Sequence, residues 1–477
     1  MNGNARRAPA GLFEGTIFLL IGAASLYLLT TEHAVYAVAP ALAAALLLLI
    51  SRDPRVGYYL VVFLIPFGAY RAFGGGKLLN LPWLIGFWLL LLIVLRFIGS
   101  KECLDQLKAN LWPLVGLYFG TSLVSALLSR YPGTSFDTLK LFLAANVFIA
   151  IGIFFLTTPK DYGRNLLLVL IVSITVNSLL GIAGYTFTLP FFAMDPESFK
   201  RSTGATVDPN NFSLMAVFSL PLIAHAFVSA RSVCSRIAAC GAFVVNLAGI
   251  VLTFSRGGAI VLVVTLALIL IRHIRRLTPG RMGIVIALSG ILIATALVVI
   301  PDSYWERQKS VLDQKVDKSI GRRSAYLTVG FQAFMENPLL GYGPGTFRDI
   351  FSQTEVALFF QREGETLRRF AHNTYLEVLV GTGGVGFLLF LGILWRALHN
   401  FHVAGKNFQA CGDEEMAAVT KAYRLSFLSL LIYLLMFSDM YHKYLLLSLT
   451  VSVLALRLSR ERTERQGGGH GHTAFSG

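Results

Sequence analysis

The chain has 477 residues, of which 55% are hydrophobic and 14% are charged, and its mean hydropathy is +0.65. These values exclude an ordinary soluble domain and indicate an integral membrane protein. The formal net charge of +15 does not indicate nucleic-acid binding, because the basic residues are distributed as membrane topology requires.

Apolar runs follow one another along almost the whole chain. Since a helix needs about 20 residues to cross about 30 Å of hydrocarbon, the shorter runs, above all 257–271, are interpreted as half-helices or tilted hairpins. The sequence predicts an all-α, polytopic bundle of about 12–14 transmembrane helices. The fourteen runs lie at 13–31, 34–50, 56–72, 81–99, 111–128, 138–157, 164–185, 210–230, 235–253, 257–271, 282–300, 374–395, 422–438 and 442–458.

The basic residues indicate the orientation of these helices. If the N-terminus is cytoplasmic, the cytoplasmic segments carry most of the lysines and arginines, including Arg6, Arg7 and the tail sequence RLSRERTER at 457–465. The long basic segment 301–371 is an exception that the rule allows, because loops of this length are translocated regardless of charge. The topology places all four cysteines on or near the reducing cytoplasmic side, so we expect neither disulfides nor a cysteine metal site. These are Cys103, Cys234, Cys240 and Cys411.

Three polar segments are predicted to face the opposite, outer side together. They are KRSTGATVDPNNF at 200–212, TFSRGGA at 253–259 and AHNTY at 371–375. Each has an ordinary explanation: Arg256 as a snorkelling arginine, Asp208 and Asn210 as turn and helix-cap residues, His372 as a residue at a helix start. Their convergence on one side of a protein with little charge favours a shared site.

The outer segment 301–371 contains a predicted amphipathic helix. In GRRSAYLTVGFQAFMENPLLGYGPGTF at 321–347, apolar residues recur every three or four positions after Arg322 and Arg323, and such a helix can lie in the headgroup layer. The following GYGPG predicts a glycine-rich turn, with a phosphate cradle as the alternative.

The sequence GTGGVG at 381–386 matches the dinucleotide-binding pattern. Its surroundings argue against that function, because Glu377 is the only charged residue between 374 and 394, so the segment is a membrane helix rather than part of a βαβ unit. We interpret the glycines as residues that let helices pack closely.

Three stretches together resemble the O-antigen ligases and the related O-antigen and exopolysaccharide polymerases. They are SRGGAI at 255–260, RRSAYLTVGFQAFMENPLLGYGPGTF at 322–347 and AHNTYLEVLVGTGGVGFLLF at 371–390. The resemblance implies a GT-C-like glycosyltransferase of the bacterial inner membrane that needs no metal or cofactor and whose active site faces the periplasm. Its donor would be an undecaprenyl-diphosphate-linked glycan. Its acceptor would be lipid A-core for a ligase, or a second lipid-linked glycan for a polymerase. Fourteen runs exceed the twelve or so helices associated with the ligases.

The apolar runs, the composition of the tail and the resemblance together predict four parts of the chain. They are N-terminal transmembrane helices at 1–200, a catalytic region at 201–400 that includes the periplasmic loop 301–371, C-terminal transmembrane helices at 401–458, and a disordered cytoplasmic tail at 459–477.

The expected chemistry assigns a role to each outer polar residue. Arginine binds phosphate oxygens bidentately, so Arg201 and Arg256 are predicted to bind the diphosphate, with Arg322 or Arg323 as a third contact. His372 is predicted to be the base that deprotonates the attacking hydroxyl, by a direct displacement that inverts the anomeric carbon. The predicted substrate-binding residues are Arg322, Arg323, Asn373, Tyr375, Asp208 and Asn210. No metal ligands are predicted, since the outer face lacks a clear aspartate pair or histidine cluster.

Other functions remain open. A transporter or flippase of polysaccharide or lipid-linked glycan would also be basic and polytopic, but it predicts repeat halves and acidic relays within the helices, and few acids occur there. A non-catalytic assembly partner predicts that His372 is dispensable. Ligase and polymerase share these motifs, and the partners expected in either case are membrane lipids and lipid-linked glycans, not nucleic acid.

Overall fold

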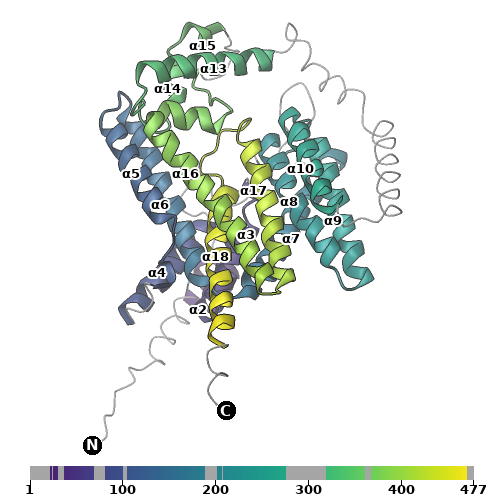
Figure 1. Cartoon of the computed structure of the whole chain (residues 1–477). Helices are drawn as coiled ribbons and strands as arrows, with labels where there is room; N and C mark the ends of the chain where they lie inside the picture. Colours follow the sequence, from purple (N-terminus) through teal and green to yellow (C-terminus); the bar gives the residue numbers. More distant parts are fainter. Residues whose placement is uncertain are drawn as a thin grey trace, which may run out of the picture.

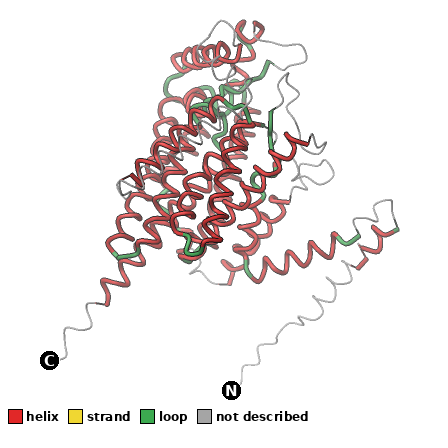
Figure 2. The backbone as a smooth tube through the Cα atoms, turned by 90° about the vertical axis from the view of Figure 1, so that its right-hand side faces the viewer, coloured by secondary structure: helices red, strands yellow, loops and turns green. Residues whose placement is uncertain are grey.

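A computed structural model gives the structure of the chain. It describes residues 22–23, 25–30, 37–68, 81–99, 105–187, 201–206, 208–274, 318–359 and 367–469. All regular elements within these ranges are helices, with no strand among them (Figure 2). The predicted all-α class is therefore confirmed.

Twelve of the predicted apolar runs correspond to helices. Of the other two, the run at 282–300 lies outside the described ranges and the run at 13–31 is described only in part. Six of the described helices are long and apolar enough to cross a membrane: α4, α6, α7 with the π-turn before it, α8, α9 and α16. The twelve helices are α2 (Ala39–Arg52), α3 (Pro54–Phe63), α4 (Leu81–Gly99), α5 (Trp112–Leu127), α6 (Pro132–Phe155), α7 (Leu166–Phe187), α8 (Pro209–Ser229), α9 (Val233–Leu252), α10 (Arg256–Ile274), α16 (Thr374–Ala410), α17 (Glu414–Tyr433) and α18 (Lys443–Gly469).

Three further helices lie across one end of the bundle, which we name the cap end (Figure 1). These are α13 (Lys318–Glu336), α14 (Phe347–Ser352) and α15 (Glu355–Phe359). The amphipathic helix predicted after Arg322 is thus confirmed as part of α13. Its inner face packs on α14 and α16 through Tyr326, Val329 and Ala333.

The centre of the bundle is formed by α8 and α18. Every residue from Phe212 to Ile223 of α8 is buried, as are most residues of α18 up to Leu458. By contrast, only 17% of the membrane-spanning window of α4 and 22% of that of α9 are buried, so these two helices lie at the periphery. A helix that is apolar all round belongs either inside a bundle or against lipid, and both kinds are found here.

The helix α16 is interrupted within GTGGVG, where an unbroken helix was predicted. Gly383 adopts φ +64° and ψ −171°, a conformation that only glycine adopts without a large cost. The chain segment 338–343 fills the interruption: Tyr342 N–H donates to the Val380 carbonyl at 3.0 Å, and Gly384 N–H donates to the Pro338 carbonyl at 2.7 Å. A break at membrane depth is tolerated because other protein groups pair the freed backbone.

The backbone hydrogen bonds of this segment also bear on the GYGPG turn at 341–345, for which the sequence left a phosphate cradle open. The N–H groups of Gly341, Tyr342 and Gly343 donate to the carbonyls of Asn337, Val380 and Gly381, at 2.9–3.1 Å. These three donors are therefore occupied by carbonyls of the protein, which favours the predicted turn over a phosphate cradle.

Two predicted boundaries also change. The boundary between residues 400 and 401 falls inside α16, so it separates no structural units. The tail predicted to be disordered from residue 459 is helical up to Gly469. Contacts with the α16–α17 turn explain this: Arg462 lies 4.0 Å from Asp413, and the Gln466 side chain donates to the Cys411 carbonyl at 3.0 Å. Cys411, Cys234 and Cys240 are free thiols, and Cys103 lies outside the described residues.

Candidate functional site

The first two predicted polar segments meet at the cap end through Arg201. Its guanidinium is buried, and its Nε donates to the Thr253 carbonyl at 2.9 Å. Thr253 belongs to the turn between α9 and α10, directly before Arg256, the half-buried first residue of α10. Arg201 therefore fixes the turn that presents Arg256.

Asn210 connects this turn to two more helices. Its side-chain oxygen accepts a hydrogen bond from Ser255 Oγ at 2.9 Å and lies 3.5 Å from an Arg201 guanidinium nitrogen. Its backbone carbonyl accepts from the Tyr433 hydroxyl at 3.0 Å, at the end of α17. The sequence-predicted Asn210 is thus the point where α8, α10 and α17 are tied together.

Asp208 begins α8 as its N-cap, because its carboxylate accepts the Asn211 N–H at 2.8 Å. A carboxylate at this position also stabilises the helix dipole. The adjacent Asn211 side chain lies 2.9 Å from Nε2 of the buried His442. Since Tyr444 N–H donates to His442 Nδ1 at 3.3 Å, the Nε2 atom carries the proton and donates to Asn211.

His372 lies in a strained turn just before α16. Its φ is +52°, in the left-handed region that non-glycine residues rarely adopt. The carboxylate of Glu377 holds the turn by accepting the Ala371 N–H at 2.8 Å, and Asn373 N–H donates to Ser438 Oγ at 3.0 Å. Strain held in place by surrounding hydrogen bonds is typical of functional sites.

The charges that act on His372 show that the polar segment 371–375 lies close to Asp208 of the segment 200–212. Burial and the positive charge of Arg323 lower the pKa of His372 to about 4, with smaller contributions from Arg322 and Arg369, while Asp208 opposes them. The ring also lies 6.3 Å, centroid to centroid, from Tyr326 of α13. The imidazole is therefore neutral at neutral pH and keeps a nitrogen lone pair available to accept a proton.

The three outer segments converge as the topology predicted, together with α13. The charges of Asp208 and Arg323 act both on the His372 ring and on the Tyr433 hydroxyl, which also bonds Asn210. Arginines and a neutral histidine thus face one region at the cap end. This arrangement suits an anionic ligand beside a group that loses a proton.

Two of the predicted substrate-binding residues, Tyr375 and Asn373, are engaged in structural hydrogen bonds. Tyr375 points into the bundle, where its hydroxyl donates to the Leu431 carbonyl at 2.9 Å and its ring packs against Phe390. Asn373 is the N-cap of α16, its side chain accepting from Leu376 N–H at 3.1 Å. The helix therefore starts after His372, and the Tyr375 side chain supports the bundle rather than the His372 turn.

The end of α17 and the connection to α18 supply residues that the sequence did not single out as site residues. Ser438 supports the His372 turn, Tyr433 and His442 support α8, and Asp439 N–H donates to Thr374 Oγ1 at 3.1 Å. The signal was the polar stretch SDMYHK at 438–443, since it interrupts two apolar runs at a predicted outer loop.

No metal site is evident in the part of the chain that the structure describes. Within those ranges no three histidine, cysteine, aspartate or glutamate side chains gather as ligands. The prediction of metal-independent chemistry is not tested by this observation and stays a prediction.

Comparison with known families bears on residues 241–391, which match the model of the O-antigen ligase family. The match covers the second part of α9, α10, the cap helices and the first part of α16. The resemblance drawn from SRGGAI, PLLGYG and the AHNTY segment is therefore confirmed over this region. A comparison with curated proteins found no match.

Proposed function

From the O-antigen ligase domain at residues 241–391, we propose that this membrane protein is a glycosyltransferase of surface-polysaccharide assembly. It transfers a glycan from undecaprenyl diphosphate to a hydroxyl acceptor at the periplasmic face of the inner membrane. One observation carries the proposal: a neutral His372 shares a site with Arg323, Asp208 and the turn that presents Arg256.

In the proposed reaction, His372 accepts the proton of the attacking hydroxyl. The oxygen forms a bond to the anomeric carbon while the bond from that carbon to the diphosphate oxygen breaks. The leaving diphosphate keeps the electron pair, so negative charge grows on it. A direct displacement of this kind inverts the anomeric configuration.

The arginines stabilise the departing diphosphate. Arg256 is placed as the main contact, since it begins α10, where the helix dipole also favours an anion. Arg201 contributes mainly by holding the turn, because its Nε is engaged with Thr253. Arg322 and Arg323 approach from α13 and act on the same region as His372.

The bound donor also adjusts the base. A diphosphate brings negative charge beside His372, which offsets the arginines that lower its pKa and makes the imidazole a stronger base. The free protein thereby keeps His372 neutral and ready, and the substrate completes its activation.

The proposal is tested by measuring donor binding and glycan transfer with Arg256→Ala. Charge-assisted hydrogen bonds contribute about 1.5–3 kcal/mol each, so we expect donor affinity to fall roughly tenfold to a hundredfold. Arg164→Ala is the matched control, because Arg164 is exposed at the opposite end of the bundle. Unchanged donor binding by Arg256→Ala would contradict the assignment.

The product distinguishes the finer claims. An inverted anomer supports direct displacement, whereas a retained one contradicts it. Transfer to lipid A-core identifies a ligase, and extension of a second lipid-linked glycan identifies a polymerase.

A further inference from the structure

Basic side chains follow one another along the exposed face of α16, toward the end of the bundle opposite the cap (Figure 1). After Trp395, the residues His399, His402 and Lys406 come at spacings of four, three and four, so these side chains share one face of the helix. All of them are exposed, as is Arg396 next to them. We name Arg396, His399, His402 and Lys406 the basic row.

The same face of α16 is apolar on the side nearer the cap. Leu388 and Trp395 are 68% and 70% exposed there, and Trp395 ends the predicted apolar run 374–395. Because tryptophan is enriched where hydrocarbon meets the headgroups, the row begins at headgroup depth, on the side predicted to be cytoplasmic. From Gly383 to Lys406 the helix rises about 34 Å, so the row is remote from the candidate functional site.

The two helical segments that form this region contain no acidic residue. Neither α16 from 395 to 410 nor α17 from 416 to 433 has an aspartate or glutamate. Arg424 of α17 adds a further cation, and its guanidinium donates to Nδ1 of His402 at 3.2 Å. Within the described part of the chain, the charges that act on His402 belong to Lys406, Arg424 and His399, which are all basic. The row therefore concentrates positive charge without an acidic counterpart in either segment.

The acids closest along the chain lie in the turn between α16 and α17, and two of the three have other partners. Asp413 lies 4.0 Å from Arg462 of α18, and Glu415 lies 3.7 Å from Arg231. These carboxylates are therefore directed to other arginines than those of the row.

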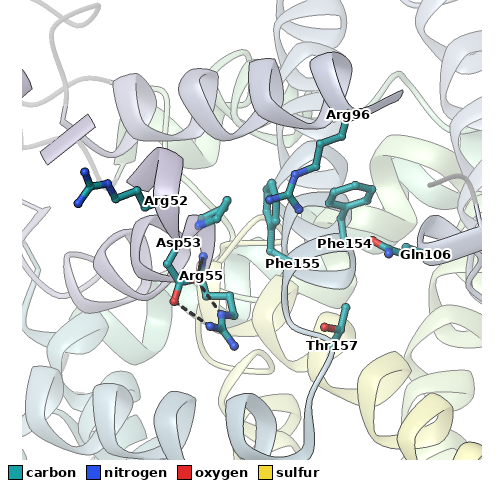
Figure 3. A pocket seen from close by; sticks show the side chains of 9 residues that line it. Arg52, Asp53, Arg55, Arg96, Gln106, Phe154, Phe155 and Thr157 are labelled. Carbon is teal, nitrogen blue, oxygen red and sulfur yellow. Dashed lines mark hydrogen bonds and ion pairs between the residues drawn. The ribbon is translucent and has the colours of Figure 1, made fainter. Parts of the chain in front are cut away.

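A second group of arginines, around a cavity of about 360 Å³, shows the contrasting case (Figure 3). There Arg55 forms two bonds of 2.8 Å with Asp53 and lies 3.4 Å from the buried carboxylate of Asp161. The guanidinium of Arg96 lies 5.4 Å from the centre of the Phe155 ring. Groups of the protein thus engage these arginines, which makes the row on α16 the better candidate for an external anion.

We propose that the basic row binds the phosphate groups of anionic phospholipids in the cytoplasmic leaflet. Basic clusters directly beyond a membrane helix attract acidic headgroups. Arg396 and Lys406 are the main contacts because both are charged at neutral pH, whereas His402 holds Arg424 beside them. A lipid covers both the apolar and the basic part of this face, while free phosphate or a soluble acidic protein leaves Leu388 and Trp395 in water. The proposal does not depend on the enzymatic reaction.

The test uses native mass spectrometry of the purified full-length protein with an equal mixture of phosphatidylglycerol and phosphatidylcholine. The wild-type protein is expected to retain phosphatidylglycerol preferentially. The double variant Arg396→Gln/Lys406→Gln is expected to lose this preference by about tenfold or more, because two charged contacts to phosphate are removed.

The matched control is Arg460→Gln/Arg465→Gln, which removes the same charge from the last turns of α18. Both arginines are exposed, and each lies four residues from a glutamate, Glu464 or Glu461, so the preference is expected to stay unchanged. Arg396→Lys/Lys406→Arg exchanges the two cations and is expected to keep most of the preference. Size-exclusion chromatography verifies that each variant is folded.

Four results would overturn the proposal. Equal retention of both lipids by the wild-type protein would favour a soluble acidic partner instead. An unchanged preference in Arg396→Gln/Lys406→Gln would place the lipid elsewhere. An equal loss in the α18 control would show a general effect of net charge. Displacement of phosphatidylglycerol by millimolar inorganic phosphate would show a site for soluble anions.

Discussion

The substitution Gly383→Ala tests the interruption of α16, which brings the cap into contact with the helix that follows His372. An added Cβ at Gly383 would lie 2.3 Å from the carbonyl carbon and oxygen of Leu339. The residue also adopts φ +64° and ψ −171°, which costs a non-glycine residue about 1–3 kcal/mol.

Two consequences add to this backbone cost. Relief of the clash requires the 338–343 segment to move away, and this breaks the hydrogen bonds from Gly384 and Val385 to the carbonyls of Pro338 and Leu339. Each lost hydrogen bond costs about 1 kcal/mol, so the total is roughly 3 kcal/mol or more. The cap then separates from α16, so transfer activity falls together with stability.

The assay is thermal unfolding of the purified protein in detergent, compared with Gly120→Ala. Gly120 lies in the interior of α5 and an added Cβ meets nothing within 4 Å, so that control is expected to be neutral or stabilised by up to about 1 kcal/mol from helix propensity. An unfolding temperature for Gly383→Ala equal to or above that of the wild type would refute the reasoning.

Three other outcomes follow from the site. The pKa of His372 is lowered to about 4, and the neutral form accepts the proton. The value of kcat/KM should therefore be flat from pH 8 down to about pH 5 and fall only below that. An inflection near pH 6.5 in the pH profile contradicts this. Glu377→Ala removes the acceptor of the Ala371 N–H and should lower kcat more than it raises KM in steady-state kinetics. Glu377→Gln keeps an acceptor oxygen and should retain most of the activity. Equal losses of activity in the two variants would contradict a positioning role for Glu377. Asn210→Ala leaves Ser255 and the buried Arg201 without this acceptor, so it should lower the unfolding free energy by about 1–3 kcal/mol, measured by thermal unfolding. Asn146→Ala on α6, remote from this cluster, is the comparison variant.

Much of the fold could be predicted because lipid imposes a simple rule. An apolar run of sufficient length has to be a helix, since its backbone must be paired internally, and twelve runs became helices. The convergence of Arg201, Asp208 and His372 was predictable as well, because the alternation of helices fixes which loops share a side.

The interruption at Gly383 could not be predicted from the local sequence. Glycines in a membrane helix usually serve close packing, and GTGGVG fits that interpretation. The break depends on a distant segment, 338–343, which supplies the hydrogen bonds that the helix gives up. The local sequence contains the glycine that permits the break, Gly383, but it does not show that the segment 338–343 pairs with the interrupted helix.

The orientation of individual side chains was equally beyond the sequence. Tyr375 lies in the first turn of α16 and points into the bundle, where its hydroxyl donates to the Leu431 carbonyl. His442 and Tyr433 were missed because they border apolar runs and act by supporting neighbours through hydrogen bonds.

The most direct test of the proposed catalysis is glycan transfer by His372→Ala in proteoliposomes that contain the undecaprenyl-diphosphate-linked donor and the acceptor. His402→Ala is the matched control, since His402 is exposed near the opposite end of α16. We predict that His372→Ala binds donor normally but transfers about 10²- to 10⁴-fold more slowly, the usual contribution of a positioned base, while His402→Ala is unaffected. Transfer by His372→Ala at the wild-type rate would contradict the assignment of His372 as the base.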